Sequence, residues 1–124
     1  MARKKKEPKI ECIAYLSVEG DLERVDYLED KQLKYIREYA RAHNIDIVGI
    51  KRRHGFSYVD VYKHFCQMET LVSKGKVDGV ILANMASVSH SVEDAYTKIG
   101  KINGAGGVLV TVDEGRLSLN ILEV

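Results

Sequence analysis

The sequence is poor in proline, tryptophan and cysteine, and each shortage excludes a class of protein. With one proline and no tryptophan in 124 residues, it contains no collagen-like or proline-rich segment. The two cysteines, Cys12 and Cys66, have neither a CxxC nor a Cys/His ligand spacing. We therefore expect two small buried thiols, the first in a strand and the second in a helix, and no disulfide framework.

Long hydrophobic runs are also missing. The apolar stretches are far shorter than the roughly 18 residues of a membrane span, and no signal peptide is recognisable. An apolar fraction of 45% beside 30% charged residues is ordinary for a globular protein, and 124 residues suit one domain. We expect a cytoplasmic, single-domain protein with no membrane partner.

Several nucleotide-binding and metal-binding motifs are absent as well. No GxGxxG follows the first apolar run, and no GxxxxGK[ST], HxxxH or HExxH occurs. Gly104, Gly106 and Gly107 follow a helical segment and precede an apolar run, whereas a phosphate-binding loop leads into a helix. These glycines indicate a helix stop, and we predict no cofactor and no metal.

The charge of the chain is small but unevenly distributed. The net charge is +1, yet residues 3–9 (RKKKEPK) and the segment Lys51–His54 are basic. Basic clusters attract nucleic-acid phosphates through counterion release, although a solvated tail that aids solubility is the alternative for the first cluster. The candidate nucleic-acid-binding residues are Lys4, Lys5, Lys6, Lys51, Arg52 and Arg53.

Buried strands and amphipathic helices are predicted to alternate along the chain. The predicted strands are Ile10–Val18, Ile45–Ile50, Val77–Leu82 and Val108–Val112, with Leu117–Val124 as the fifth if there are five. The predicted helices run from about Tyr27 to His43, Val59 to Ser73 and Val92 to Asn103. Ser87, Ser89 and Ser91 precede the third helix, where an N-cap is the simplest role for one of them.

This order predicts an α/β fold, a three-layer αβα architecture with a mainly parallel sheet of four to five strands. In such folds a ligand binds beyond the C-terminal ends of the strands. The loops in which to look for chemistry are therefore Ser17–Asp21, Arg52–Tyr58 and Asn84–His90.

Several segments, taken in order, resemble the N-terminal catalytic domain of the serine recombinase (resolvase/invertase) family. IAYLSVEGDLE is similar to that family's first strand and its Tyr-x-Arg-x-Ser signature, and Gln32-Leu33 with Tyr39-Ala40 resembles its QL…YA pattern. METLVSKGKVDGVILAN and GAGGVLVTVDEG resemble later strands, and MASVSHSVEDAY takes the place of its LDRLSRN segment. The resemblance implies a resolvase-like domain of the flavodoxin-like class over residues 10–124, behind a basic tail at residues 1–9.

In that family a serine hydroxyl attacks a DNA phosphodiester and forms a phosphoserine link, while arginines stabilise the charge of the phosphate. Aligned to this pattern without gaps, the sequence keeps Tyr15 but has Ser17 at the first arginine and Glu19 at the nucleophilic serine. The other family positions hold Tyr62 for the arginine of the second helix, Ala86-Ser87 for the Asp-Arg pair, Ser89 for the matching serine and His90 for the last arginine.

These replacements change the function that the resemblance implies. A glutamate cannot form a phosphoserine, and the loss of even one anion-stabilising donor costs about 2.7–4 kcal/mol at the transition state. We expect a catalytically inactive domain that acts through dimer or synapse contacts, as a homodimer or with a recombinase, and through weak DNA contact. The chain stops where the family's dimerisation helix and DNA-binding domain follow, so DNA contact is expected to rest on the tail and Lys51–Arg53.

Two alternative functions stay open at this point. A two-residue shift makes Ser17 the nucleophile of an active recombinase fragment, because Ser17 and Glu19 have the same strand parity. Arg52, Arg53 and His90 then supply positive charge, although one histidine is a weak, pH-dependent substitute for arginine. The other alternative is an unrelated small α/β module that binds a small anionic ligand, since a fold does not fix a function.

Overall fold

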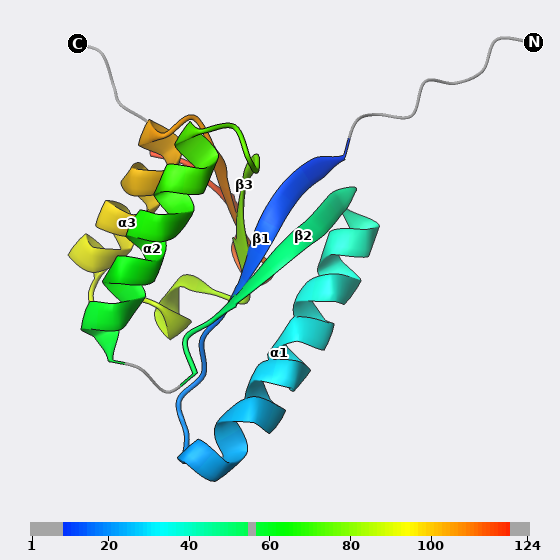
Figure 1. Ribbon diagram of the computed structural model, residues 1–124, viewed down its shortest axis with the longest axis vertical. Helices are drawn as coiled ribbons and strands as arrows, with labels where there is room; N and C mark the ends of the chain where they lie inside the picture. Colours follow the sequence, from blue (N-terminus) through cyan, green and yellow to red (C-terminus); the bar gives the residue numbers. More distant parts are fainter. Residues whose placement is uncertain (1–8, 55–56, 120–124) are drawn as a thin grey trace, which may run out of the picture.

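The computed structural model of the chain describes residues 9–54 and 57–119, which form five strands, three α-helices and one short 3-10 helix. In chain order these are β1 (Ile10–Leu16), α1 (Leu22–Ala42), β2 (Ile45–Arg52), α2 (Tyr58–Ser73), β3 (Gly79–Leu82), η1 (Met85–Ser87), α3 (Val92–Gly104), β4 (Val108–Thr111) and β5 (Gly115–Leu117). Figure 1 shows α1 on one side of the sheet and α2 with α3 on the other.

The sheet has the strand order β2-β1-β3-β4-β5. The first four strands in the chain pair in parallel, and β5 pairs antiparallel with β4. The predicted three-layer α/β fold with a mainly parallel sheet is therefore confirmed. Because β1 lies between β2 and β3, the loops that follow these three strands come together at one edge of the sheet.

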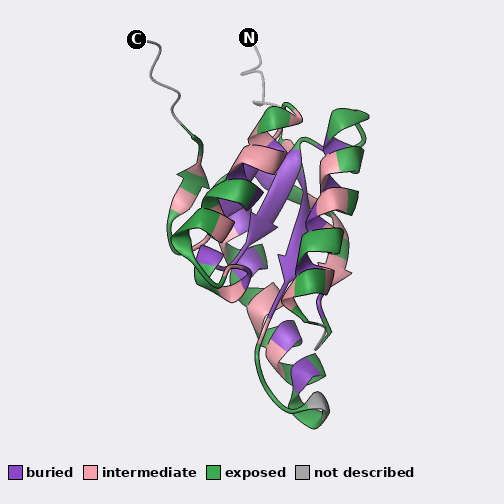
Figure 2. Cartoon of the chain, turned by 90° about the vertical axis from the view of Figure 1, so that its left-hand side faces the viewer, coloured by how far each residue is buried: buried purple, intermediate pink, exposed green. Residues whose placement is uncertain are grey.

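The alternation of side chains along β1 divides the core between the two faces of the sheet. Cys12, Ala14 and Leu16 pack toward Ile36 and the rest of the α1 face. The opposite face of the sheet packs on α2 and α3 through a larger cluster that includes Ile13, Tyr15, Val61, Phe65, Met68, Val80, Leu82, Ile99, Ile102 and Leu109. Figure 2 shows these buried strands between helices whose outer surfaces are exposed.

The first helix begins at Leu22, five positions before the predicted start near Tyr27. The cause is its composition: the first turns are polar, and in residues 23–27 only Val25 is buried, so no apolar stripe marks them. Asp21 takes the N-cap position and Glu23 lies in the first turn, where a carboxylate suits the positive end of the helix dipole. These turns extend beyond the end of the strands (Figure 1).

The fifth strand also differs from its prediction. It covers Gly115–Leu117 and follows a tight turn, in which Thr111 Oγ1 accepts the Glu114 N–H at 2.8 Å and Gly115 has φ of +82°. The predicted range Leu117–Val124 overlaps it at one residue, and residues 120–124 lie outside the described part of the chain. Apolar content alone predicted this strand too far along the sequence, because the chain reverses direction within the polar residues that precede Leu117.

The turn after α3 lies where the glycines predicted a helix stop. Gly106 has φ of +90° directly after the Ala105 C-cap, so the predicted helix stop is confirmed.

Cys12 is fully buried, and burial raises the pKa of its thiol to about 12. Cys66, on α2, is only half-buried. Both cysteines are free.

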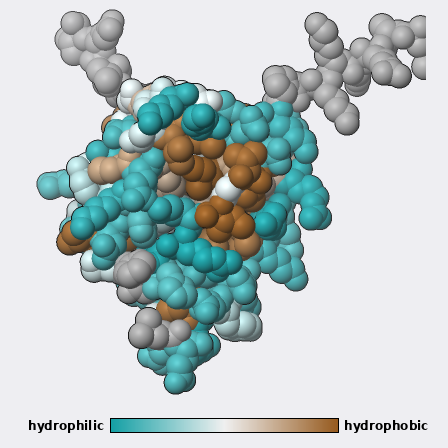
Figure 3. Space-filling model, viewed as in Figure 1, coloured by the Kyte–Doolittle hydropathy of each residue, from teal (hydrophilic) through white to brown (hydrophobic). Residues whose placement is uncertain are grey.

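The outer edge of the sheet is formed by β2, which carries exposed apolar side chains. Val48 is 46% exposed and Ile50 is 42% exposed. Val48 has no partner in β1, because Cys12 pairs with Ile47 and Ile13 pairs with Gly49 across a register shift. Figure 3 shows the hydrophobic area of this face between α1 and α2, where β2 runs. None of the helices in the described ranges is long and apolar enough to cross a membrane.

Candidate functional site

The three loops singled out from the sequence meet at the C-terminal edge of the sheet. Residues 17–21 follow β1, residues 53–57 follow β2 and residues 83–91 follow β3, which are neighbouring strands. The loops after β1 and β3, together with α1, line a hollow of 460 Å³ that includes Ser17, Glu19, Gln32 and Ser87. A second hollow of 300 Å³ lies between the starts of α2 and α3. This edge is the candidate site.

Ser17 is buried, and both its backbone and its hydroxyl form hydrogen bonds. Its side chain and backbone are 1% exposed. The Gln32 amide accepts the Ser17 N–H at 2.7 Å and donates to the Ser17 carbonyl at 2.9 Å. The Ser17 hydroxyl donates to the Ser87 carbonyl at 2.5 Å and accepts from Arg53 Nη1 at 3.3 Å. The hydroxyl therefore ties the β1 loop to the β3 loop.

Glu19, at the family's nucleophile position, is exposed and lies in a ring of polar and aromatic groups. Tyr58 Oη donates to Glu19 Oε1 at 3.1 Å. The Tyr58 ring meets the His90 ring edge-on, with 5.5 Å between centroids, and Arg53 Cζ lies 4.7 Å from the centre of the Tyr58 ring. The structure thus brings Glu19 and His90 together through Tyr58, a residue that the sequence did not single out.

His90 is the first of three neighbouring ionisable side chains that lead along α3. Its ring Nδ1 lies 3.3 Å from Asp94 Oδ2, and Lys98 Nζ lies 2.6 Å from the same carboxylate. Burial acts to raise the pKa of Asp94, but the hydrogen bond and charge of Lys98, with His90, hold that pKa below its ordinary value. Lys98 is 1% exposed, so its charge serves Asp94 rather than an incoming anion.

The remaining family positions are dispersed. Tyr15 is fully buried on the α2 side, where its hydroxyl meets His64 Nδ1 at 2.8 Å, and burial raises its pKa. Tyr62 is 45% exposed and its ring lies 5.0 Å from Lys101 Nζ. Ser87 is fixed by Asn84, which accepts its N–H at 2.9 Å and its hydroxyl at 2.8 Å.

The three serines before α3 have different surroundings. Ser91 Oγ accepts the Asp94 N–H at 3.0 Å, so the predicted N-cap is Ser91. The buried Ser89 hydroxyl has no hydrogen-bond partner among the described residues. Of the three, only Ser87 contacts the β1 loop, through its carbonyl.

The basic residues at the end of β2 are engaged inside the molecule. Arg52 reaches Asp30 at 3.0 Å and Glu29 at 3.4 Å, and the hydrogen bond to Asp30 raises its pKa. Arg53 is buried against Ser17 and Tyr58. Lys51 is half-buried, and Lys4, Lys5 and Lys6 lie outside the described residues.

A cluster that the sequence analysis missed lies behind this edge. Asp26, Glu29 and His54 bring oxygen and nitrogen ligand atoms within 4.8 Å of one another. Glu29 is fully buried, accepts the His54 N–H at 2.8 Å and also receives Arg52. Because a guanidinium already neutralises Glu29, the cluster serves as an ion-pair network that holds α1 to the end of β2. The signal was present: Glu29 interrupts the buried stripe of Val25, Ile36 and Ala40 on α1.

This topology, with its polar loops at the C-terminal edge of a mainly parallel sheet, defines a three-layer α/β domain. Sequence comparison adds nothing further, since no family model and no curated protein matches the chain.

Solved structures show which α/β domains share this fold. A resolvase family site-specific recombinase from Streptococcus pneumoniae superposes with a TM-score of 0.70 at 18% identity, over 86% of this chain and 74% of that one. The N-terminal catalytic domain of TP901-1 integrase gives 0.68 at 16% identity, over 85% and 78%. The C-terminal catalytic domain of ISC1926 TnpA, an IS607-like serine recombinase, gives 0.67 at 18% identity, over 83% and 67%. The chain has the fold of serine recombinase catalytic domains, as its sequence predicted.

Proposed function

We propose that this chain is a serine-recombinase-type domain of DNA recombination machinery that does not cleave DNA. It acts by associating with an active recombinase or with a second copy of itself. The observation that carries the proposal is the surroundings of Ser17 and Glu19 in the loop after β1. Glu19, at the nucleophile position, offers a carboxylate held by Tyr58, and the nearby Ser17 hydroxyl is buried and bonded to Ser87.

The charges around these residues support the same proposal. Phosphoryl transfer requires cations aimed at the phosphate oxygens. Here Arg52 is paired with Glu29 and Asp30, and Lys98 is buried against Asp94. A phosphate at this edge would meet the exposed Glu19 carboxylate first. The site therefore favours contact between proteins over attack on DNA.

Association is tested by mixing the full chain with a serine recombinase encoded in the same genome. Light scattering after size-exclusion chromatography measures the mass of each complex. The proposal predicts a homodimer or a mixed complex at micromolar concentrations. A chain that stays monomeric alone and in every mixture would contradict it.

One contact favours a second candidate, an active fragment that uses Ser17. Arg53 Nη1 lies 3.3 Å from Ser17 Oγ, where a guanidinium would stabilise a phosphate bonded to that oxygen. This candidate requires the hydroxyl to leave Ser87 and become exposed. It predicts covalent protein–DNA adducts that Ser17→Ala abolishes.

A further inference from the structure

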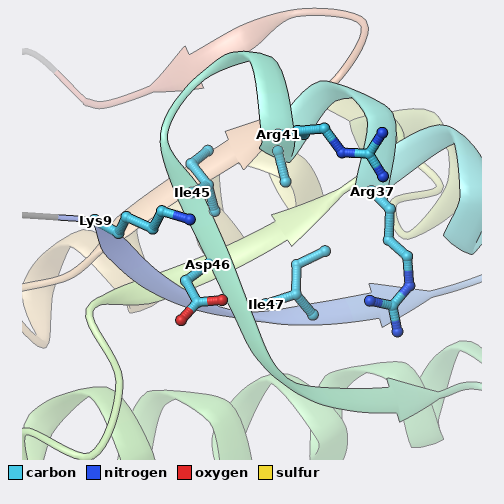
Figure 4. A pocket seen from close by; sticks show the side chains of 7 residues that line it. Lys9, Arg37, Arg41, Ile45, Asp46 and Ile47 are labelled. Carbon is cyan, nitrogen blue, oxygen red and sulfur yellow. The ribbon is translucent and has the colours of Figure 1, made fainter.

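A third hollow, lined by charged side chains, lies at the N-terminal ends of the strands, opposite the candidate site. Its volume is 210 Å³, and it is bounded by the end of α1, the start of β2 and the residue before β1. Figure 4 shows Arg37 and Arg41 side by side on α1, with Lys9 and Asp46 across the start of β2. Since β1 has seven residues at about 3.3 Å each, roughly 20 Å separates this edge from Ser17.

The cations of this hollow form no ion pairs within the described residues, whereas Arg52 and Lys98 at the candidate site do. Lys9, Arg37 and Arg41 form no ion pair with any acidic residue of the described ranges, and all three are exposed. Asp46 is the one carboxylate among the residues that line the hollow. Three cations against one anion leave this hollow positive.

The sequence before Lys9 adds to that charge. Arg3, Lys4, Lys5 and Lys6 precede it within six residues, against one acidic residue, Glu7. The basic tail predicted from the sequence therefore directly precedes Lys9 along the chain.

We propose that Lys9, Arg37 and Arg41 bind the phosphate backbone of duplex DNA at this edge. The inference rests on the proposed role in recombination and places the DNA contact away from the candidate site. Guanidinium groups bond phosphate oxygens in pairs, and a concave hollow admits the ridge of a backbone, whereas a flat lipid surface reaches only its rim.

Arg41 also has a structural role that the test must separate from binding. It lies in the last turn of α1, where a cation suits the negative end of the helix dipole. A purely structural role would change the unfolding temperature of the chain. It would leave the salt dependence of DNA binding unchanged, and this slope counts the phosphates neutralised.

The experiment measures binding of the full chain to a labelled duplex of mixed sequence by fluorescence anisotropy, between about 50 and 200 mM salt. Arg37→Ala/Arg41→Ala removes two charges from the hollow. Arg24→Ala/Lys63→Ala removes two exposed charges from α1 and α2 elsewhere and serves as the matched control. Phosphatidylserine vesicles test the competing partner.

The wild type should bind the duplex, and the slope of log K against log salt should fall by roughly 2 in the hollow variant, since each phosphate contact contributes about 0.9. The control variant should keep the wild-type slope. Equal slopes in wild type and hollow variant, equal losses in both double variants, or binding to vesicles but not to the duplex would overturn the inference. Association with a recombinase is measured separately, so loss of DNA binding with intact association refutes this inference alone.

Discussion

Ser17 and Glu19 lie two residues apart after β1, and neither presents an exposed hydroxyl to a phosphate. The sequence predicted a role for both positions, because the family pattern fixes where they fall along the chain. It could not show that Arg53 would reach Ser17, since this contact joins residues 36 positions apart through the packing of two loops. Contacts of that kind depend on the whole fold rather than on local pattern.

His64 should titrate below the ordinary histidine pKa of 6.5. Its burial lowers its pKa, and the nearby charge of Lys51 lowers it further, against the opposing effect of Asp60. Between the folded pKa and 6.5 the unfolded chain binds more protons, so the stability present above pH 6.5 should decrease as the pH falls through this window. NMR titration of the ring protons measures the midpoint.

Lys51→Ala should raise the His64 midpoint toward 6.5, because it removes the charge that disfavours the imidazolium. Lys63→Ala, on the exposed side of α2, should leave it unchanged. A wild-type midpoint at or above 6.5 would show that His64 is not held in its neutral form.

Lys98→Ala should destabilise the fold by about 3 kcal/mol, because it leaves the Asp94 carboxylate without its buried partner. Urea unfolding measures the change. The double variant Asp94→Asn/Lys98→Met should lose less than the sum of the single variants, since it removes both charges and keeps most of the lysine stem. A loss below about 1 kcal/mol for Lys98→Ala would contradict the role of this pair.

At the scale of elements, the strands and the later helices followed from the sequence because their patterns are driven by burial. The stripe of α2 (Val61, Phe65, Met68, Val72) matches its buried face, and the helix begins within one residue of its prediction. The start of α1 and the position of β5 did not follow, because polar turns that extend past the core carry no hydrophobic period. Prediction succeeds where the core dictates the residue type.

Gly79 marks the close approach of β3 to β4 and provides a test at this scale. A Cβ at this position would lie 2.0 Å from the Val108 carbonyl oxygen. Gly79→Ala should therefore cost about 3 kcal/mol or more, because backbone cannot move aside without disturbing the strand pairing. Gly104→Ala, where nothing lies within 4 Å, should be neutral or stabilise by up to about 1 kcal/mol. Equal effects of the two substitutions on thermal unfolding would contradict this packing.

At the scale of the whole molecule, the two edges of the sheet differ in what their charges do. At the C-terminal edge Arg52, Arg53 and Lys98 are engaged inside the protein, and at the N-terminal edge Arg37 and Arg41 are not. The sequence predicted the fold, and the three loops in which it placed the candidate site follow neighbouring parallel strands. It placed the basic residues of β2 outward, because charge alone does not reveal which cations the fold will pair.

The central claim is that this scaffold does not form a phosphoserine link with DNA. The most direct measurement joins the chain to the DNA-binding domain of an active serine recombinase and traps covalent adducts on that recombinase's own site by denaturing electrophoresis. The active parent is the positive control, and Ser17→Ala and Glu19→Ser variants are run beside the wild-type fusion. The account predicts no adduct above background for all three fusions, because the phosphate-stabilising arginines are missing as well as the nucleophile. An adduct formed by the wild-type fusion and lost in Ser17→Ala would contradict it.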